Sequence, residues 1–134
     1  MPAKAFFDTN VLIYALAQND RRSSRAETLL SNGGVISTQV LNEFVSMARR
    51  KMQMSWNDIR AAIDAILVLC PSPLPITLTL HEAALTIAEK NRYGIYDALV
   101  IAAALQAKCR ILFSEDLQEG QIIAGQLTIR NPFG

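Results

Sequence analysis

The chain of 134 residues is 51% hydrophobic and 19% charged, with 6 glycines and 5 prolines, which excludes disordered and low-complexity proteins. Domains of roughly 100–200 residues are common, so the length predicts one domain with one core over residues 1–134. The net charge of +1 excludes a uniformly basic nucleic-acid-binding surface but leaves local basic patches open.

Short apolar runs typical of β-strands alternate with helical patterns along the chain. We expect strands at residues 5–7, 35–37, 110–114 and 127–130, and a short edge strand at 75–77, where proline is tolerated. A first helix is predicted at 21–30 with Asp20 as its N-cap, and apolar residues between Val40 and Met52 repeat with the spacing of a second. Capping boxes that start at Ser55 and Thr79 predict two more helices, separated by three prolines between residues 71 and 75.

The last predicted helix, residues 97–105, is apolar on all sides and should therefore be buried. Alternating strands and helices predict an α/β fold, a three-layer α/β/α sandwich around a mainly parallel sheet of four to five strands. Functional side chains in such folds gather outside the carboxyl ends of the strands.

The small number of cysteines indicates a reducing compartment, and the short apolar stretches indicate a protein that does not span a membrane. Cys70 and Cys109 are too few for a disulfide scaffold, and we expect both to be free thiols. The longest apolar stretch, residues 98–105, is far shorter than the roughly 20 residues of a membrane span. We therefore expect a cytoplasmic protein that does not bind membranes.

Two acidic side chains directly follow predicted strands. Asp8 follows strand 5–7, and Asp116 follows strand 110–114 with Glu115 beside it as an alternative. Each could simply cap a turn or a helix, because aspartate accepts hydrogen bonds from free backbone N–H groups.

Two further acidic side chains lie on predicted helices. Asp97 opens the buried last helix, where an unpaired carboxylate is costly, so a functional role competes with simple capping. Glu43 lies roughly 130° from the apolar stripe of its helix and therefore faces either solvent or a cleft.

Four carboxylates at one edge of a sheet would repel one another, so their pKa values rise or a cation neutralises them. Oxygen-only ligands indicate Mg²⁺ or Mn²⁺. The single histidine, His81, lies in a predicted helix start, which argues against a histidine-based zinc site and against a Ser/His/Asp triad. Carboxylate-bound Mg²⁺ suits phosphodiester hydrolysis with either one or two ions, and Arg21, Arg22 and Arg25 are candidates for binding such a polyanionic substrate.

These segments resemble PIN-domain ribonucleases, most of all the bacterial VapC-type toxins. The resemblance spans residues 5 to about 130 and is strongest in the D-T-N-V-L tract from Asp8 and the Y-D-A-L-V-I-A-A-A tract from Tyr96. It implies Mg²⁺- or Mn²⁺-dependent cleavage of single-stranded or looped RNA, a homodimer and a cognate antitoxin. The implied site residues are the catalytic and metal-binding acids Asp8, Glu43, Asp97 and Asp116, with the supporting side chains Thr9, Asn10 and Ser114.

Three other functions stay open at this point. An RNA-processing nuclease would use the same acids without being a toxin. A phospho-receiver or phosphotransferase would use Asp8 as an acceptor, although residues 8–10 lack the second acid of a D-x-D motif. A binding module without catalysis is the third.

Overall fold

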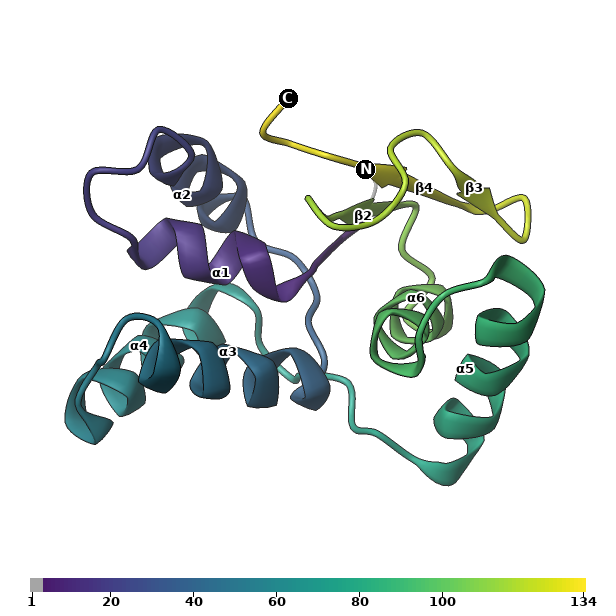
Figure 1. Cartoon of the computed structure of the whole chain (residues 1–134), viewed down its shortest axis with the longest axis horizontal. Helices are drawn as coiled ribbons and strands as arrows, with labels where there is room; N and C mark the ends of the chain where they lie inside the picture. Colours follow the sequence, from purple (N-terminus) through teal and green to yellow (C-terminus); the bar gives the residue numbers. More distant parts are fainter. Residues whose placement is uncertain (1–3) are drawn as a thin grey trace.

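The computed structural model describes residues 4–134, so the first three residues of the predicted domain lie outside the described part (Figure 1). The described residues form, in chain order, β1 (Ala5–Phe7), α1 (Thr9–Leu16), α2 (Ser23–Ser31), α3 (Thr38–Arg50), α4 (Trp56–Leu69), α5 (Leu78–Asn91), α6 (Ile95–Gln106), β2 (Ile111–Phe113), β3 (Ile122–Ile123) and β4 (Leu127–Arg130). Within this range, no helix combines the length and the hydropathy that crossing a membrane requires. Cys70 and Cys109 are buried and unpaired, as predicted.

The four strands form one sheet in the order β1-β2-β4-β3. Phe6 pairs with Leu112 and Leu112 with Ile129, both in parallel register, whereas β3 runs antiparallel to β4. In Figure 1, α1 to α4 gather on one side of the view and α5 and α6 on the other, with β2, β3 and β4 above α5 and α6. The predicted α/β class and mainly parallel sheet are confirmed, and β3 adds an antiparallel edge that the sequence analysis did not predict.

Two predicted strands are wrong. Residues 35–37 make only single bridges, Val35 to Phe6 and Ser37 to Leu74, because the chain leaves the sheet at Ser37 to begin α3. Residues 75–77 form no strand either, since the prolines at 73 and 75 have no N–H to donate. The sheet consequently has four strands, the lower end of the predicted range.

The helix starts also differ in part from the prediction. Ser55 caps α4 as expected by accepting a 3.1 Å hydrogen bond from the backbone N–H of Asp58. The start predicted at Thr79 is wrong, because the hydroxyl of Thr77 accepts from Leu80 N–H and begins α5 two residues earlier. The helix predicted at 21–30 begins later, because α2 starts at Ser23 and Asp20 is not its N-cap. The helix α1 was not predicted at all.

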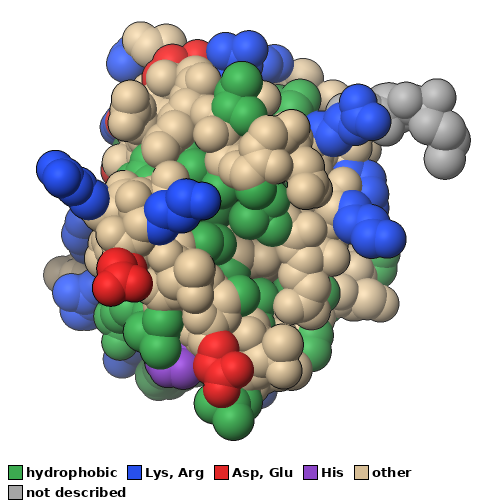
Figure 2. Space-filling model, turned by 90° about the vertical axis from the view of Figure 1, so that its right-hand side faces the viewer, with side chains coloured by type: hydrophobic (Ala, Val, Ile, Leu, Met, Phe, Trp, Pro, Cys, Tyr) green, Lys and Arg blue, Asp and Glu red, His purple; other side chains and the backbone are tan. Residues whose placement is uncertain are grey.

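The buried apolar core draws on the sheet and on all six helices of the described residues, and α6 contributes the longest continuous run. All residues from Ala98 to Ala104 are buried, which confirms the prediction from the apolar pattern. A run of small alanines lets α5 pack closely against α6 on one side while α6 packs against β2 on the other. Away from this core, apolar side chains reach the surface of the α5 and β3 face, where Leu78 is 73% and Ile122 is 62% exposed (Figure 2).

Candidate active site

Asp8 lies where β1 ends and α1 begins, at the carboxyl edge of the sheet. Its backbone N–H donates to the carbonyl of Phe113 at 3.0 Å, which fixes the end of β1 against the end of β2. Oδ1 of Asp8 accepts from the Thr9 N–H at 2.7 Å, and Oδ2 accepts from the Ser114 hydroxyl at 2.7 Å. Asp8 is thus a helix cap and a pocket residue at once, because one carboxylate oxygen serves the helix and the other faces β2.

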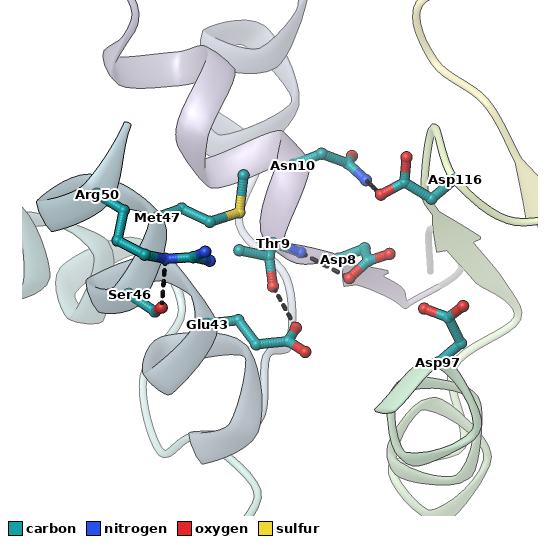
Figure 3. Close-up of a pocket in the computed structure, with 9 residues that line it drawn as sticks. All are labelled: Asp8, Thr9, Asn10, Glu43, Ser46, Met47, Arg50, Asp97 and Asp116. Atoms are coloured by element: carbon teal, nitrogen blue, oxygen red, sulfur yellow. Dashed lines mark hydrogen bonds between the residues drawn. The ribbon is translucent and has the colours of Figure 1, made fainter. Parts of the chain in front are cut away.

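The other three acids reach the same space from different elements. Glu43 of α3 accepts from the Thr9 hydroxyl at 2.9 Å, so it faces the pocket. Asp116, in the loop after β2, accepts from the side-chain amide of Asn10 at 3.2 Å. Asp97 projects from the first turn of α6, and in Figure 3 the four carboxylates lie around the same space.

The three supporting side chains hold these acids in place. Besides binding Asp8, the Ser114 hydroxyl accepts a 3.1 Å hydrogen bond from the backbone N–H of Asp116. Oδ1 of Asn10 accepts from the backbone N–H of Glu115 at 3.3 Å, while its amide nitrogen serves Asp116. Since Ser114 and Thr9 are almost fully buried, they orient the carboxylates without competing water.

A cavity of about 250 Å³ opens at this edge of the sheet. Its lining consists of the four acids, two of their supporting residues and three further residues of α3, namely Asp8, Thr9, Asn10, Glu43, Ser46, Met47, Arg50, Asp97 and Asp116. Ser46, Met47 and Arg50 were not predicted as site residues. The available signal was their spacing, because residues three, four and seven positions after Glu43 share its face of the helix.

The pocket concentrates negative charge. The pKa of Asp8 is raised to about 6, mainly by burial and in smaller part by the charges of Glu43 and Asp116, although its hydrogen bonds to Ser114 and Thr9 act to lower it. Burial also raises the pKa of Asp97, again with contributions from Asp116 and Glu43. None of the salt bridges among residues 4–134 involves any of the four acids.

Glu115 and the predicted basic residues lie elsewhere. Nη1 of Arg22 is 2.9 Å from Oε1 of Glu115, which turns this acid away from the pocket that Asp116 lines. Arg21, Arg22 and Arg25 are absent from the pocket lining, and Arg21 instead donates to the carbonyl of Phe133 at 3.4 Å. Arg50 is the basic side chain that the structure places in the pocket wall.

The donor set fits a hard divalent cation in its chemistry. The acids offer carboxylate oxygens only, and a cation would offset both the burial that raises the pKa of Asp8 and the repulsion from Glu43 and Asp116. Among residues 4–134, however, no three side chains of His, Cys, Asp or Glu are grouped closely enough to hold an ion as they stand. The carboxylates would have to move closer together around the ion.

Comparison of the sequence with known protein families finds a match. The PIN domain family matches residues 5–118 of the chain. No curated protein matches the sequence.

Solved structures of several bacterial proteins share the fold. A toxin–antitoxin complex from Klebsiella pneumoniae has a TM-score of 0.72 at 19% identity, covering 96% of this chain and 98% of that one. FitAcB from Neisseria gonorrhoeae has a TM-score of 0.67 at 17% identity, covering 96% and 98%. VapC20 of Mycobacterium tuberculosis, a toxin that cleaves the sarcin-ricin loop, has a TM-score of 0.64 at 22% identity, covering 84% and 92%.

Proposed function

Because the chain belongs to the PIN-domain family, we propose that it is a Mg²⁺- or Mn²⁺-dependent endoribonuclease and the toxin of a toxin–antitoxin pair. The observation that carries the proposal is the convergence of Asp8, Glu43, Asp97 and Asp116 on one open pocket from four separate segments. Carboxylates without cationic partners at the end of a parallel sheet suit a metal-assisted reaction on a polyanion.

The four acids would hold the ion, and each has a definable part in doing so. A bound divalent cation polarises a phosphoryl oxygen, acidifies a water molecule and stabilises the leaving oxygen in an in-line displacement. Asp8 is the fixed point of the site because Ser114 and Thr9 hold both of its oxygens. Glu43, held by the Thr9 hydroxyl, and Asp116, held by the Asn10 amide, would supply further carboxylate oxygens to the ion.

Asp97 differs from the other acids because no residue among 4–134 forms a hydrogen bond with its carboxylate. It stands in the first turn of α6, where the N–H groups of the helix start favour the ionised carboxylate. Burial nevertheless raises its pKa. A bound cation would therefore offset the cost of ionising this partly buried carboxylate.

The antitoxin is the second part of the proposal. Three of the similar structures are described as toxin–antitoxin assemblies or by paired toxin and antitoxin names. This chain has an almost wholly apolar groove of about 250 Å³ between α1, α2 and α4. An apolar groove bounded by helices suits one face of an amphipathic helix, and we place the antitoxin there. The homodimer expected from the resemblance is tested by the mass of the purified protein in solution.

The decisive experiment incubates purified protein with a single-stranded and a hairpin RNA in Mg²⁺, in Mn²⁺ and in chelator. Cleavage should require the metal and disappear in Asp97→Asn. Asp64→Asn is the matched control, since Asp64 is an exposed acid of α4 outside the pocket. Cleavage that persists in chelator or in Asp97→Asn would refute the proposal.

Toxin and RNA-processing roles differ in their effect on the host. A toxin arrests growth when expressed alone, and the product of the adjacent gene relieves the arrest. An RNA-processing nuclease with the same chemistry would leave growth unchanged and need no such partner.

A further inference from the structure

Arg50 is placed to bind an anion beside the four carboxylates. It lies on the last turn of α3, seven residues after Glu43, and therefore on the same helix face roughly 10 Å further along the axis. Its Nε donates a 3.2 Å hydrogen bond to the hydroxyl of Ser46, one turn earlier. In Figure 3 this contact directs the guanidinium into the pocket, toward Thr9.

The terminal nitrogens of Arg50 are not used by the fold. Among residues 4–134, Arg50 forms no salt bridge, and its one side-chain hydrogen bond engages Nε alone. The adjacent Arg49 is engaged elsewhere, because it stacks 4.5 Å from the ring centre of Trp56 and donates to the carbonyl of Met54 at 2.9 Å. Arg50 therefore offers two N–H groups in the fork that matches two phosphate oxygens.

A purely structural role explains this arrangement less well. A cation near the end of a helix is stabilised by the helix dipole, but Arg49 and Lys51 supply that charge without entering the pocket. An ion pair with Glu43 would neutralise one acid, but the two side chains form none. What remains is a guanidinium held at the rim of an acidic pocket and open to a ligand of opposite charge.

We propose that Arg50, oriented by Ser46, binds a phosphodiester group of the RNA next to the one at the four carboxylates. This inference rests on the proposed function and adds a direction, since the RNA strand then runs along α3 from Glu43 toward Arg50. The contact is to the phosphate and not to a base. It therefore contributes equally to substrates of every sequence.

The test measures RNA binding separately from cleavage. A fluorescein-labelled single-stranded RNA is titrated with the Asp97→Asn protein, which should not cleave it, over a series of salt concentrations. The same titration is repeated with double variants that carry Arg50→Ala, Arg50→Lys or Arg49→Ala in addition to Asp97→Asn. Arg50→Ala should bind about tenfold more weakly. The slope of log affinity against log salt should also fall by about 0.7, the value for one phosphate contact on a single strand.

The controls separate a phosphate contact from a general charge effect. Arg49→Ala removes the same charge one residue away and should leave both affinity and slope unchanged, and Arg50→Lys should keep the slope but lose part of the affinity. With Asp97 restored, Arg50→Ala should raise KM and leave kcat within about threefold. Equal losses in Arg49→Ala and Arg50→Ala, or no change in Arg50→Ala, would overturn the inference while the parent protein still cleaves RNA. A parent protein that neither binds nor cleaves RNA would instead refute the proposed function.

Discussion

Arg22 holds Glu115 away from the acidic pocket through a salt bridge of 2.9 Å between Nη1 and Oε1. The same guanidinium donates two hydrogen bonds of 2.9 Å to the carboxylate of Asp20 and lies 3.8 Å from the ring centre of Tyr14. The next residue, Asp116, lines the pocket instead. Two adjacent acids are thus divided between a structural ion pair and the candidate site.

The first prediction tests this division. Arg22→Met keeps the aliphatic stem but leaves Glu115, whose Oε2 is buried with no hydrogen-bond partner among residues 4–134, as an unpaired charge. We expect a loss of about 1–3 kcal/mol in the free energy of unfolding. Adding Glu115→Gln to Arg22→Met should restore part of the lost free energy of unfolding, because the double variant no longer buries the Glu115 charge. Urea unfolding of both single variants and the double variant measures the coupling, and strictly additive losses would show that the pair does not interact.

Much of the site was predictable because it depends on local chemistry. Asp8 and Asp97 occupy a strand end and a first helical turn, positions that sequence patterns reveal. The all-apolar pattern of α6 correctly predicted burial. Glu43 was ambiguous from periodicity alone, since only the packing of α3 against α1 decides whether its face meets solvent or a cleft.

The remainder depends on contacts between distant segments. Arg22 and Arg50 look alike in sequence, but Arg22 meets Glu115 across 93 residues whereas Arg50 meets no acid among residues 4–134. The two-residue strand β3 exists only because β4 pairs with it, and Val35 is held by a single bridge to Phe6. Propensity is a weak guide for such short segments.

A second prediction concerns Gly34, where the chain passes over β1. A Cβ at this position would lie 2.4 Å from Cε2 of Phe7 and 2.9 Å from the carbonyl oxygen of Ala5. Gly34→Ala should therefore displace β1, the strand that Asp8 directly follows, and cost about 2–3 kcal/mol of stability. Gly94→Ala is the control, because a Cβ there meets nothing within 4 Å and should cost less than about 1 kcal/mol. Thermal unfolding compares the two, and equal losses would contradict the packing argument.

A third prediction concerns the Ser114 hydroxyl, which bonds both Asp8 and the backbone of Asp116. Ser114→Ala should keep the fold but lower metal-dependent cleavage about 10–100-fold, because two acids lose their orientation together. The exposed hydroxyl of Thr86 on α5 provides the control, and Thr86→Ala should cleave normally. RNA cleavage by Ser114→Ala at the parent rate would show that the hydroxyl does not orient the site.

A fourth prediction tests the antitoxin groove. Leu16 lines the groove and is 37% exposed, so Leu16→Glu should place a charge in an apolar contact and prevent co-purification with the product of the adjacent gene. Val68→Glu is the control, because Val68 is 79% exposed on α4 but lies outside the groove lining. RNA cleavage by both variants should be unchanged. A complex that survives Leu16→Glu would place the partner on another surface.

The last prediction follows from the raised pKa of Asp8, which burial moves from 3.8 to about 6. Between these values the folded protein binds more protons than the unfolded chain, so the stability of the metal-free protein falls as pH rises through this window. Above pH 6 the ionised carboxylate costs about 3 kcal/mol, the equivalent of the two-unit difference. Asp8→Asn removes this charge, and its amide oxygen can still accept from Thr9 or Ser114.

Asp8→Asn should therefore stabilise the metal-free protein at pH 7.5 by up to about 3 kcal/mol, and this gain should shrink toward pH 4. In Mn²⁺ the parent should become more stable than Asp8→Asn, because an ion that binds the folded parent stabilises it by mass action and the variant has lost a ligand. Urea unfolding from pH 4 to pH 8, in chelator and in Mn²⁺, measures both effects. A variant less stable than the parent at pH 7.5 in chelator would mean that Asp8 is held by its hydrogen bonds at no electrostatic cost. In that case the pocket would have no need of a cation.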